Sequence, residues 1–120
     1  MILIVEDDPQ VARLIALVLE RNGFEGEILA DGQIALAKAK ADRPQLIFAD
    51  LTIKGMAGDV LCTSLKQDES TRGIPFVVLS GDRDIAERAK NCGADDHLGK
   101  PFEFEDLIRL VNKYAKSNDG

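Results

Sequence analysis

Five short strand-like segments, each followed by a helical pattern, constrain the fold of this chain more than any other feature of its sequence. The third segment is the apolar run 46–51, which is bounded by Pro44 and by a loop that contains Gly55 and Gly58. A short continuous apolar run is typical of a strand buried on both faces, as in a parallel sheet. The run contains one carboxylate, Asp50, so we expect this acid at the edge where open α/β sheets place their ligands.

The order of the segments predicts five strands that alternate with five helices. Asp8 and Pro9 suit the N-cap and first residue of a helix, and Asn22 and Gly23 suit its end. Strands are expected over residues 2–5, 25–30, 46–51, 75–80 and 96–99, and helices over 9–21, 33–41, 59–67, 85–91 and 103–116. Each connection is long enough for a right-handed crossover, which predicts a doubly wound parallel sheet with helices on both faces.

The bulk composition is that of one soluble globular domain. At 120 residues, 45% hydrophobic and 30% charged, the chain has room for a single core. We expect the domain over residues 1–116 and a frayed polar tail over 117–120. The formal net charge of −6 disfavours direct binding to nucleic acid, which requires a positive field.

The two cysteines, Cys62 and Cys92, are thirty positions apart, with no C-x-x-C motif and no histidine pair nearby. This spacing predicts neither a zinc site nor a disulfide framework, and free thiols in a reducing cytosol are expected. The apolar run Ile2–Val5 is too short for a signal peptide or a membrane span, and acids follow it at once. The expected location is therefore the cytoplasm, without membrane attachment.

Three acids are predicted to share one crevice, because Asp7 and Asp8 follow the first strand and Asp50 ends the third. Carboxylates at such short distances raise one another's pKa values and destabilise the fold unless a cation lies between them. A site of oxygen ligands with few protein groups suits Mg²⁺. The alternative is that acids after strands only cap helices, and Asp8 before Pro9 fits that role.

Two further polar residues end strands of the same sheet. Lys100, before Pro101, is predicted to bring an ammonium group to the crevice, although a lone lysine is usually solvated. An X-Pro bond in a tight turn is sometimes cis, which would give Lys100 a fixed direction. Ser80 ends the fourth strand, either as a hydroxyl donor to an anion or as an ordinary turn residue.

Together these fragments resemble the response-regulator receiver domain, over nearly the whole chain from Ile2 to about Lys116. The matching stretches, in order, are 5–8, 49–51 with Met56 and Gly58, 78–81, 93–98 and 100–102. The resemblance implies a flavodoxin-like fold with strand order 2-1-3-4-5. Its topological switch point lies beside the first strand, in agreement with the predicted crevice.

The resemblance also implies phosphoryl transfer. Asp50 would accept a phosphoryl group from a histidine kinase or a histidine phosphotransfer protein. Mg²⁺ would be held by Asp7, Asp50 and the backbone carbonyl of Thr52, with Asp8 acting directly or through a water. Lys100 would pair with Asp50 before transfer and with the phosphoryl oxygens afterwards. The metal and the lysine are needed because transfer brings two anions together.

Output and lifetime are assigned by the same resemblance. Ser80 would close on the phosphoryl group and move the switch residue, which here is His97 instead of the usual Tyr or Phe. His97 is equally suited to being a solvated side chain or to titrating against neighbouring acids. Thr52, Gly81 and Asp82 would tune the access of water to a labile acyl phosphate.

A partner surface for an effector or a second copy of the chain is implied over segments 85–91, 96–99 and 103–116. Its cations are Arg83, Arg88, Lys90 and Arg109, which suit salt-bridged dimerisation but are also ordinary solvated charges. Lys54 stands where the family commonly has proline, which leaves the rigidity of that loop open.

Three other functions compete with the receiver assignment. A flavodoxin-like nucleotide or flavin module needs a phosphate-binding loop after the first strand, where the acids 6–8 repel phosphate instead. An aspartyl-phosphate hydrolase typically carries a second acid where Thr52 stands. A pseudo-receiver usually lacks the acids and the lysine. We therefore predict no enzyme beyond Mg²⁺-dependent self-phosphorylation and self-dephosphorylation at Asp50.

Overall fold

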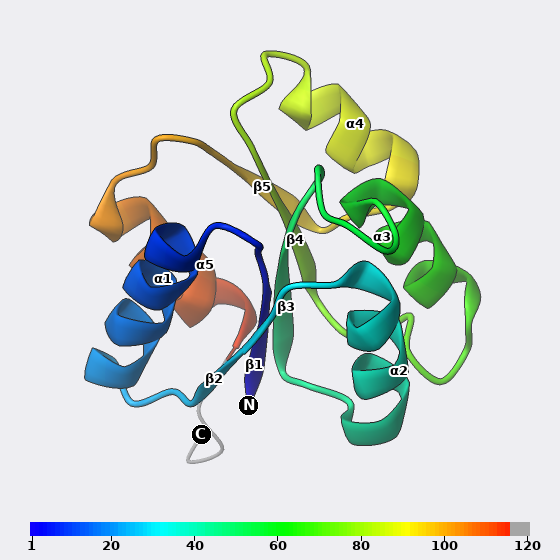
Figure 1. Cartoon of the computed structure of the whole chain (residues 1–120), viewed down its shortest axis with the longest axis horizontal. Coiled ribbons are helices and arrows are strands. Elements are labelled where there is room, and N and C mark those ends of the chain that lie inside the picture. Colours follow the sequence, from blue (N-terminus) through cyan, green and yellow to red (C-terminus); the bar gives the residue numbers. More distant parts are fainter. Residues whose placement is uncertain (116–120) are drawn as a thin grey trace.

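The computed structural model describes residues 1–115 and contains the ten predicted elements in the predicted order (Figure 1). The strands are β1 (Ile2–Val5), β2 (Gly26–Leu29), β3 (Leu46–Asp50), β4 (Phe76–Ser80) and β5 (Asp96–Gly99). The helices are α1 (Pro9–Arg21), α2 (Gly32–Asp42), α3 (Gly58–Gln67), α4 (Ile85–Cys92) and α5 (Phe104–Tyr114). The alternation of buried strands and helices therefore predicted every element, with end points that differ by one or two residues.

All strand pairs are parallel, and the sheet has the order β2-β1-β3-β4-β5 that the family resemblance implied. Helices α1 and α5 cover one face of the sheet, and α2, α3 and α4 cover the other (Figure 1). In register, Val5 lies beside Ala49 and Asp50 lies beside Leu79. The carboxyl ends of the three central strands consequently meet at one edge.

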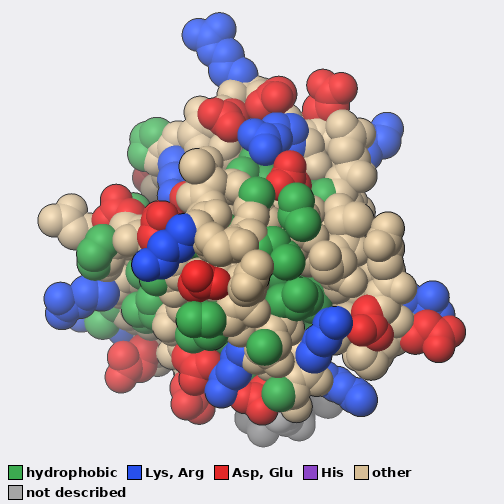
Figure 2. Space-filling model, turned by 45° about the vertical axis from the view of Figure 1, so that its right-hand side comes forward, with side chains coloured by type: hydrophobic (Ala, Val, Ile, Leu, Met, Phe, Trp, Pro, Cys, Tyr) green, Lys and Arg blue, Asp and Glu red, His purple; other side chains and the backbone are tan. Residues whose placement is uncertain are grey.

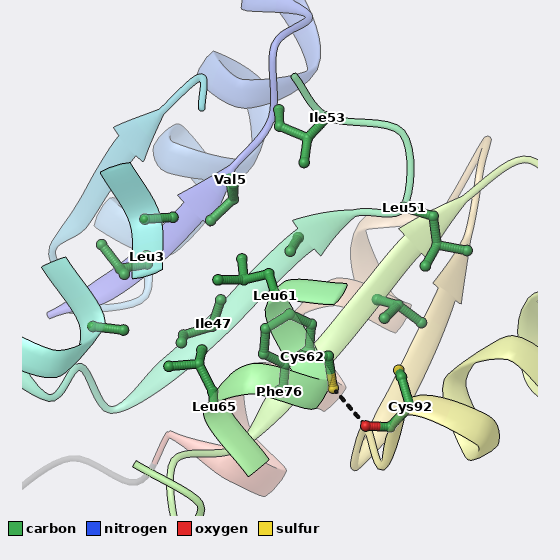
Figure 3. Close-up of a cluster of buried hydrophobic side chains, with 14 of the residues drawn as sticks. Leu3, Val5, Ile47, Leu51, Ile53, Leu61, Cys62, Leu65, Phe76 and Cys92 are labelled. Carbon is green, nitrogen blue, oxygen red and sulfur yellow. Dashed lines mark hydrogen bonds between the residues drawn. The ribbon is translucent and has the colours of Figure 1, made fainter. Parts of the chain in front are cut away.

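Two apolar layers fill the space between the sheet and its helices, because the three central strands are buried on both faces. In β1, Leu3 and Val5 contribute to the layer under α2, α3 and α4, whereas Ile2 and Ile4 contribute to the layer under α1 and α5. The first layer also holds Cys62 and Cys92 (Figure 3). Both cysteines are free, as predicted, and the Cys62 thiol donates to the Cys92 carbonyl oxygen at 3.4 Å.

Two large apolar side chains of the helices lie on the surface. Ile34 in α2 is 57% exposed, and Val60 in α3 is 51% exposed. Helix α2 instead buries Ala35 and Ala39 together with Gly32. Small side chains let this helix lie close to the sheet, so its buried face is set by distance and not by hydrophobicity alone.

The chain end and the surface complete the fold. Predicted residue Lys116, which would end both the last helix and the domain, lies outside the described residues, as does the predicted tail 117–120. Within residues 1–115, no helix is both long enough and apolar enough to cross a membrane. Figure 2 shows the side on which the right-hand helices of Figure 1 come forward, where acidic and basic side chains alternate around scattered apolar ones.

Candidate functional site

Asp50 is fixed at the carboxyl end of β3 with both of its carboxylate oxygens engaged. Its Oδ1 accepts a hydrogen bond from the backbone N–H of Thr52 at 2.8 Å, and its Oδ2 accepts one from the amino group of Lys100. The residue is only 9% exposed. A single buried carboxylate is thus presented at the edge of the sheet in one orientation.

Glu6 is a site residue that the sequence-based predictions did not include. Its Oε1 accepts from the amino group of Lys100, its Oε2 accepts from the N–H of Asp7 at 3.1 Å, and its side chain is fully buried. Burial raises the pKa of Glu6, and so does the neighbouring Asp50 carboxylate, whereas Lys100 lowers it; the net shift is upward. Glu6 and Asp50 are therefore two acids that share one ammonium group.

Strand alternation explains why these three side chains meet, because successive side chains of a strand point to opposite faces. Glu6, Asp50 and Lys100 each follow, by two positions, a residue of the layer under α1 and α5. Those residues are Ile4, Phe48 and Leu98. Counting by two from the buried residues of the first strand would have identified Glu6. Its backbone N–H donates to the Leu29 carbonyl, which extends the ladder between β1 and β2 by one residue.

Lys100 lies between the two acids, and its contact with Asp50 is the one that the family resemblance implied. Burial lowers the pKa of Lys100, but the hydrogen bonds to Asp50 and Glu6 outweigh this effect and raise it. The Lys100–Pro101 peptide bond is cis. The Lys100 backbone N–H donates to the Ser80 carbonyl at 2.8 Å, which joins the end of β5 to the end of β4.

The other two acids of the predicted metal site have different surroundings. Asp8 is the N-cap of α1, and its Oδ1 accepts from the N–H groups of Gln10 at 3.0 Å and Val11 at 3.4 Å, so the capping interpretation is confirmed. Asp7 lies one residue closer to the sheet and is exposed. Its ligand role, like that of Asp8 and of the Thr52 carbonyl, stays a prediction.

The donor set of this edge fits a hard cation. No three side chains of His, Cys, Asp or Glu in the described part of the chain converge closely enough to hold a metal by themselves. Mg²⁺ does not require such a cage, because it keeps several waters and binds through one or two carboxylates. Oxygen groups from Asp7, Asp50 and Thr52 at the ends of adjacent strands match this requirement.

The loop after β3 is held by the start of α2, which answers the question raised by Lys54 in place of proline. The Lys54 carbonyl accepts from the N–H of Gly32 at 2.8 Å. A Cβ at Gly55, whose φ is +82°, would lie 2.4 Å from the Asp31 carboxylate that caps α2. A Cβ at Gly58 would lie 2.1 Å from the Asp50 carbonyl oxygen. Close packing of glycines therefore fixes this loop.

Ser80 is buried at the end of β4, and its hydroxyl oxygen accepts from the N–H of Asp82 at 3.0 Å. Among residues 1–115, no hydrogen bond joins its hydroxyl group to Asp50 or Lys100. A Cβ at Gly81 would meet only the Lys100 carbonyl, at 3.8 Å, so space is open beside the site. The predicted roles of Ser80, Gly81 and Asp82 stay predictions.

His97 lies on the exposed side of β5, and its backbone N–H donates to the Asp96 carboxylate. Its side chain contacts neither Ser80 nor any acid by a hydrogen bond or ion pair in the part of the chain that the structure describes. The switch role of His97 therefore stays a prediction that requires movement of the loop after β4.

Two of the predicted surface cations are engaged within the chain. Arg88 pairs with Asp59 and Asp82, and Arg109 pairs with Asp106 of the same helix. Arg83 and Lys90 form no ion pair in residues 1–115 and are exposed. The partner surface implied by the resemblance consequently offers fewer unpaired cations than the sequence indicated.

Comparisons with known proteins agree with this geometry. The chain is 34% identical over 120 residues to the DNA-binding response regulator MtrA of Mycolicibacterium smegmatis. The alignment covers 98% of this chain and 51% of that protein. The chain thus spans about half the length of the curated relatives it matches. The fold matches the crystal structure of a putative response regulator from Chloroflexus aurantiacus, with 34% identity, a TM-score of 0.89 and coverage of 96% and 97%.

A second solved structure bears on the metal. The receiver domain of a sensor histidine kinase from Pseudomonas aeruginosa, solved with a magnesium ion coordinated in its active site cleft, has a TM-score of 0.87 and 27% identity. It covers 97% of both chains. The family model of the response regulator receiver domain matches residues 2–112, which is nearly the whole described chain. The chain therefore belongs to the response regulator receiver domain family of two-component signal transduction.

Proposed function

We propose that this receiver domain accepts a phosphoryl group on Asp50 from a phosphohistidine of a histidine kinase or a histidine phosphotransfer protein. The observation that carries the proposal is the Lys100 ammonium group, which contacts both the Asp50 carboxylate and the buried Glu6 carboxylate. A cation held at that position offsets the repulsion between the acceptor carboxylate and an incoming phosphoryl group.

In the transfer step, an Asp50 carboxylate oxygen forms a bond to phosphorus while the bond from phosphorus to the donor imidazole nitrogen breaks. The electron pair of that bond stays on the imidazole. Mg²⁺, when bound, neutralises charge on the phosphoryl oxygens. We assign its protein ligands to Asp7, Asp50 and the Thr52 carbonyl, and we assign the supporting acid to Glu6, because the Asp8 carboxylate caps α1.

The N–H of Thr52 orients the acceptor, because it binds the carboxylate oxygen that Lys100 does not contact. The product is an acyl phosphate, which water hydrolyses. Thr52, Gly81 and Asp82 flank the place where that water approaches, and we propose that they set the lifetime. Ser80 then closes on the phosphoryl group and transmits the change to His97; an unchanged response in His97→Ala would remove the last step.

Receiver domains are generally not enzymes with a separate substrate, and the proposed reactions here are confined to Asp50 itself. We place the domain in the cytoplasm, where its two free cysteines are stable. We further propose that α4, β5 and α5 bind an effector or a second copy of the chain, without direct contact to nucleic acid. The net charge of −6 disfavours contact with a polyanion.

The test is incubation of the purified chain with Mg²⁺ and acetyl phosphate, followed by intact-mass spectrometry. We expect one phosphoryl group per chain, which is lost when the protein is left with Mg²⁺ and no chelator. We expect none in Asp50→Asn. Repeated turnover of a phosphomonoester would support the hydrolase instead, and flavin or nucleotide binding without phosphorylation would support a binding module. Phosphotransfer from candidate histidine kinases would then identify the physiological donor.

A further inference from the structure

The guanidinium group of Arg88 bridges two segments that flank the site. Its Nη1 lies 3.0 Å from the Asp82 carboxylate in the loop after β4, and its Nη2 lies 3.2 Å from the Asp59 carboxylate at the start of α3. Asp59 is the main cause of the raised pKa of Arg88, and the charges of Asp84 and Asp82 raise it further. Helices α3 and α4 pack side by side, so that one side chain reaches both segments (Figure 1).

Each end of this bridge is attached to the chemistry by a short path. The Asp82 N–H donates to the Ser80 hydroxyl, so the acid that Arg88 binds belongs to the same turn as the residue proposed to close on the phosphoryl group. At the other end, Asp59 follows Gly58, whose N–H donates to the Leu51 carbonyl directly after Asp50. Arg88 therefore connects the loop of the acceptor to the loop of the readout residue.

We propose that Arg88 is a positioning residue that holds the Ser80 turn in the conformation seen here, as a latch between α3 and the loop after β4. The proposal rests on the phosphoacceptor function, because the latch opposes the movement of Ser80 toward a phosphoryl group on Asp50. Release of the latch favours the conformation in which Ser80 contacts that group. A phosphoryl group or its mimic then needs less binding free energy to populate that conformation than it needs in the wild-type protein.

The size of the effect follows from the exposure of the pairs. The side chains of Arg88 and Asp59 are about one third exposed, and that of Asp82 is about half exposed. Exposed ion pairs of this kind each change an equilibrium by a factor of about 1.5 to 5. Loss of both arms in Arg88→Gln is therefore expected to shift the loop equilibrium about 2- to 10-fold.

Two variants separate a latch from a simple charge effect. Arg88→Gln removes a positive charge, whereas Asp59→Asn removes a negative one and keeps the contact of the Asp59 side chain with the Val60 N–H. If charge near the site were the cause, the two variants would change the affinity for an anion in opposite directions. A latch predicts that both change it in the same direction, with Arg83→Gln as the matched control for charge.

The first measurement is hydrogen exchange of the Asp82 amide in the unphosphorylated chain. We expect exchange about 2- to 10-fold faster in Arg88→Gln, a smaller increase in Asp59→Asn, and the wild-type rate in Arg83→Gln. This measurement involves no phosphoryl group, so wild-type exchange in Arg88→Gln overturns the latch even where the phosphoacceptor function stands. Conversely, a wild-type chain that takes up no phosphoryl group refutes the phosphoacceptor function and leaves this result valid.

The second measurement is the affinity for beryllofluoride, a mimic of the phosphoryl group, in the presence of Mg²⁺. We expect tighter binding in both Arg88→Gln and Asp59→Asn, by about 2- to 10-fold in the former. Shifts in opposite directions, or shifts equal to that of Arg83→Gln, would overturn the proposal. In a Ser80→Ala background, the Arg88 effect is expected to vanish, because the latch acts through that hydroxyl.

Discussion

Replacement of Gly58 by alanine tests how tightly the acceptor strand is packed. Alanine normally stabilises a helix relative to glycine by about 1 kcal/mol, and Gly58 is the first residue of α3. Here the added Cβ would lie 2.1 Å from the Asp50 carbonyl oxygen and 2.9 Å from the Leu51 Cα. Ordinary C···O contacts lie at about 3.3 Å, so the backbone at Asp50 must move by about 1 Å.

The expected consequence is a loss of both stability and acceptor function. Overpacking against backbone costs about 1–3 kcal/mol, which outweighs the gain in helix propensity and lowers the midpoint of thermal unfolding by several degrees. A displacement of about 1 Å at a reacting group costs up to about 100-fold in rate. We therefore expect Gly58→Ala to unfold at a lower temperature and to acquire a phosphoryl group on Asp50 about 10- to 100-fold more slowly.

Gly73→Ala is the matched control, because a Cβ there has nothing within 4 Å and the backbone φ is not positive. This control is expected to keep the wild-type stability or gain a few tenths of a kcal/mol through the unfolded state. Circular dichroism measures the unfolding, and intact mass with acetyl phosphate measures the acceptor rate. A Gly58→Ala protein as stable and as reactive as Gly73→Ala would refute the packing argument.

Three further predictions concern charged side chains. Folding raises the pKa of Glu6 above its ordinary value of 4.5, so ionisation of Glu6 destabilises the folded state as the pH rises through that value. The free energy of unfolding of Glu6→Gln, measured in urea, should therefore increase relative to that of the wild type from pH 4.5 to 7. A constant difference between the two proteins would contradict this. Lys66→Met should cost about 1–3 kcal/mol, since the amino group binds two carbonyls and a carboxylate, whereas exposed Lys54→Met should be neutral by thermal unfolding. Mg²⁺ at one hundred times its Kd should stabilise the fold by about 2.7 kcal/mol in Asp8→Asn, which keeps the cap, but not in Asp7→Asn. Equal responses of the two variants by thermal shift would contradict the assignment of Asp7 as the ligand.

The order of the strands and helices was predictable because the three central strands are apolar runs buried on both faces, which interrupt the helical pattern sharply. The faces of the helices were less predictable. Ile34 is apolar yet exposed, while Ala35 and Ala39 are buried, because the distance between α2 and the sheet admits only small side chains. That distance depends on the close contact of Gly32 with the Met56 backbone, which is a tertiary property.

The candidate site divides in the same way. The arrival of Lys100 in the crevice of Asp50 was predictable, since parallel strands bring their carboxyl ends together, and the pairing of the two residues was implied by the family resemblance. Asp7 and Asp8 were predicted as site residues because they follow the first strand, without regard to the alternation of side chains along that strand. Glu6 was not predicted. It is buried and continues the hydrogen-bond ladder of β1, and its carboxylate is the one that contacts Lys100.

The charges at this edge support the proposal that a divalent metal takes part in the transfer. Lys100 contacts two acids, Glu6 and Asp50, and compensates only one of their negative charges. Asp7, the next residue after Glu6, adds a third carboxylate, so the group carries two net negative charges when all of its members are ionised. A divalent cation brings the site to neutrality, and only then is the approach of a phosphoryl dianion not opposed by the site itself. Burial is the first cause of the raised pKa of Glu6, and the adjacent Asp50 carboxylate raises it further, while Lys100 lowers it.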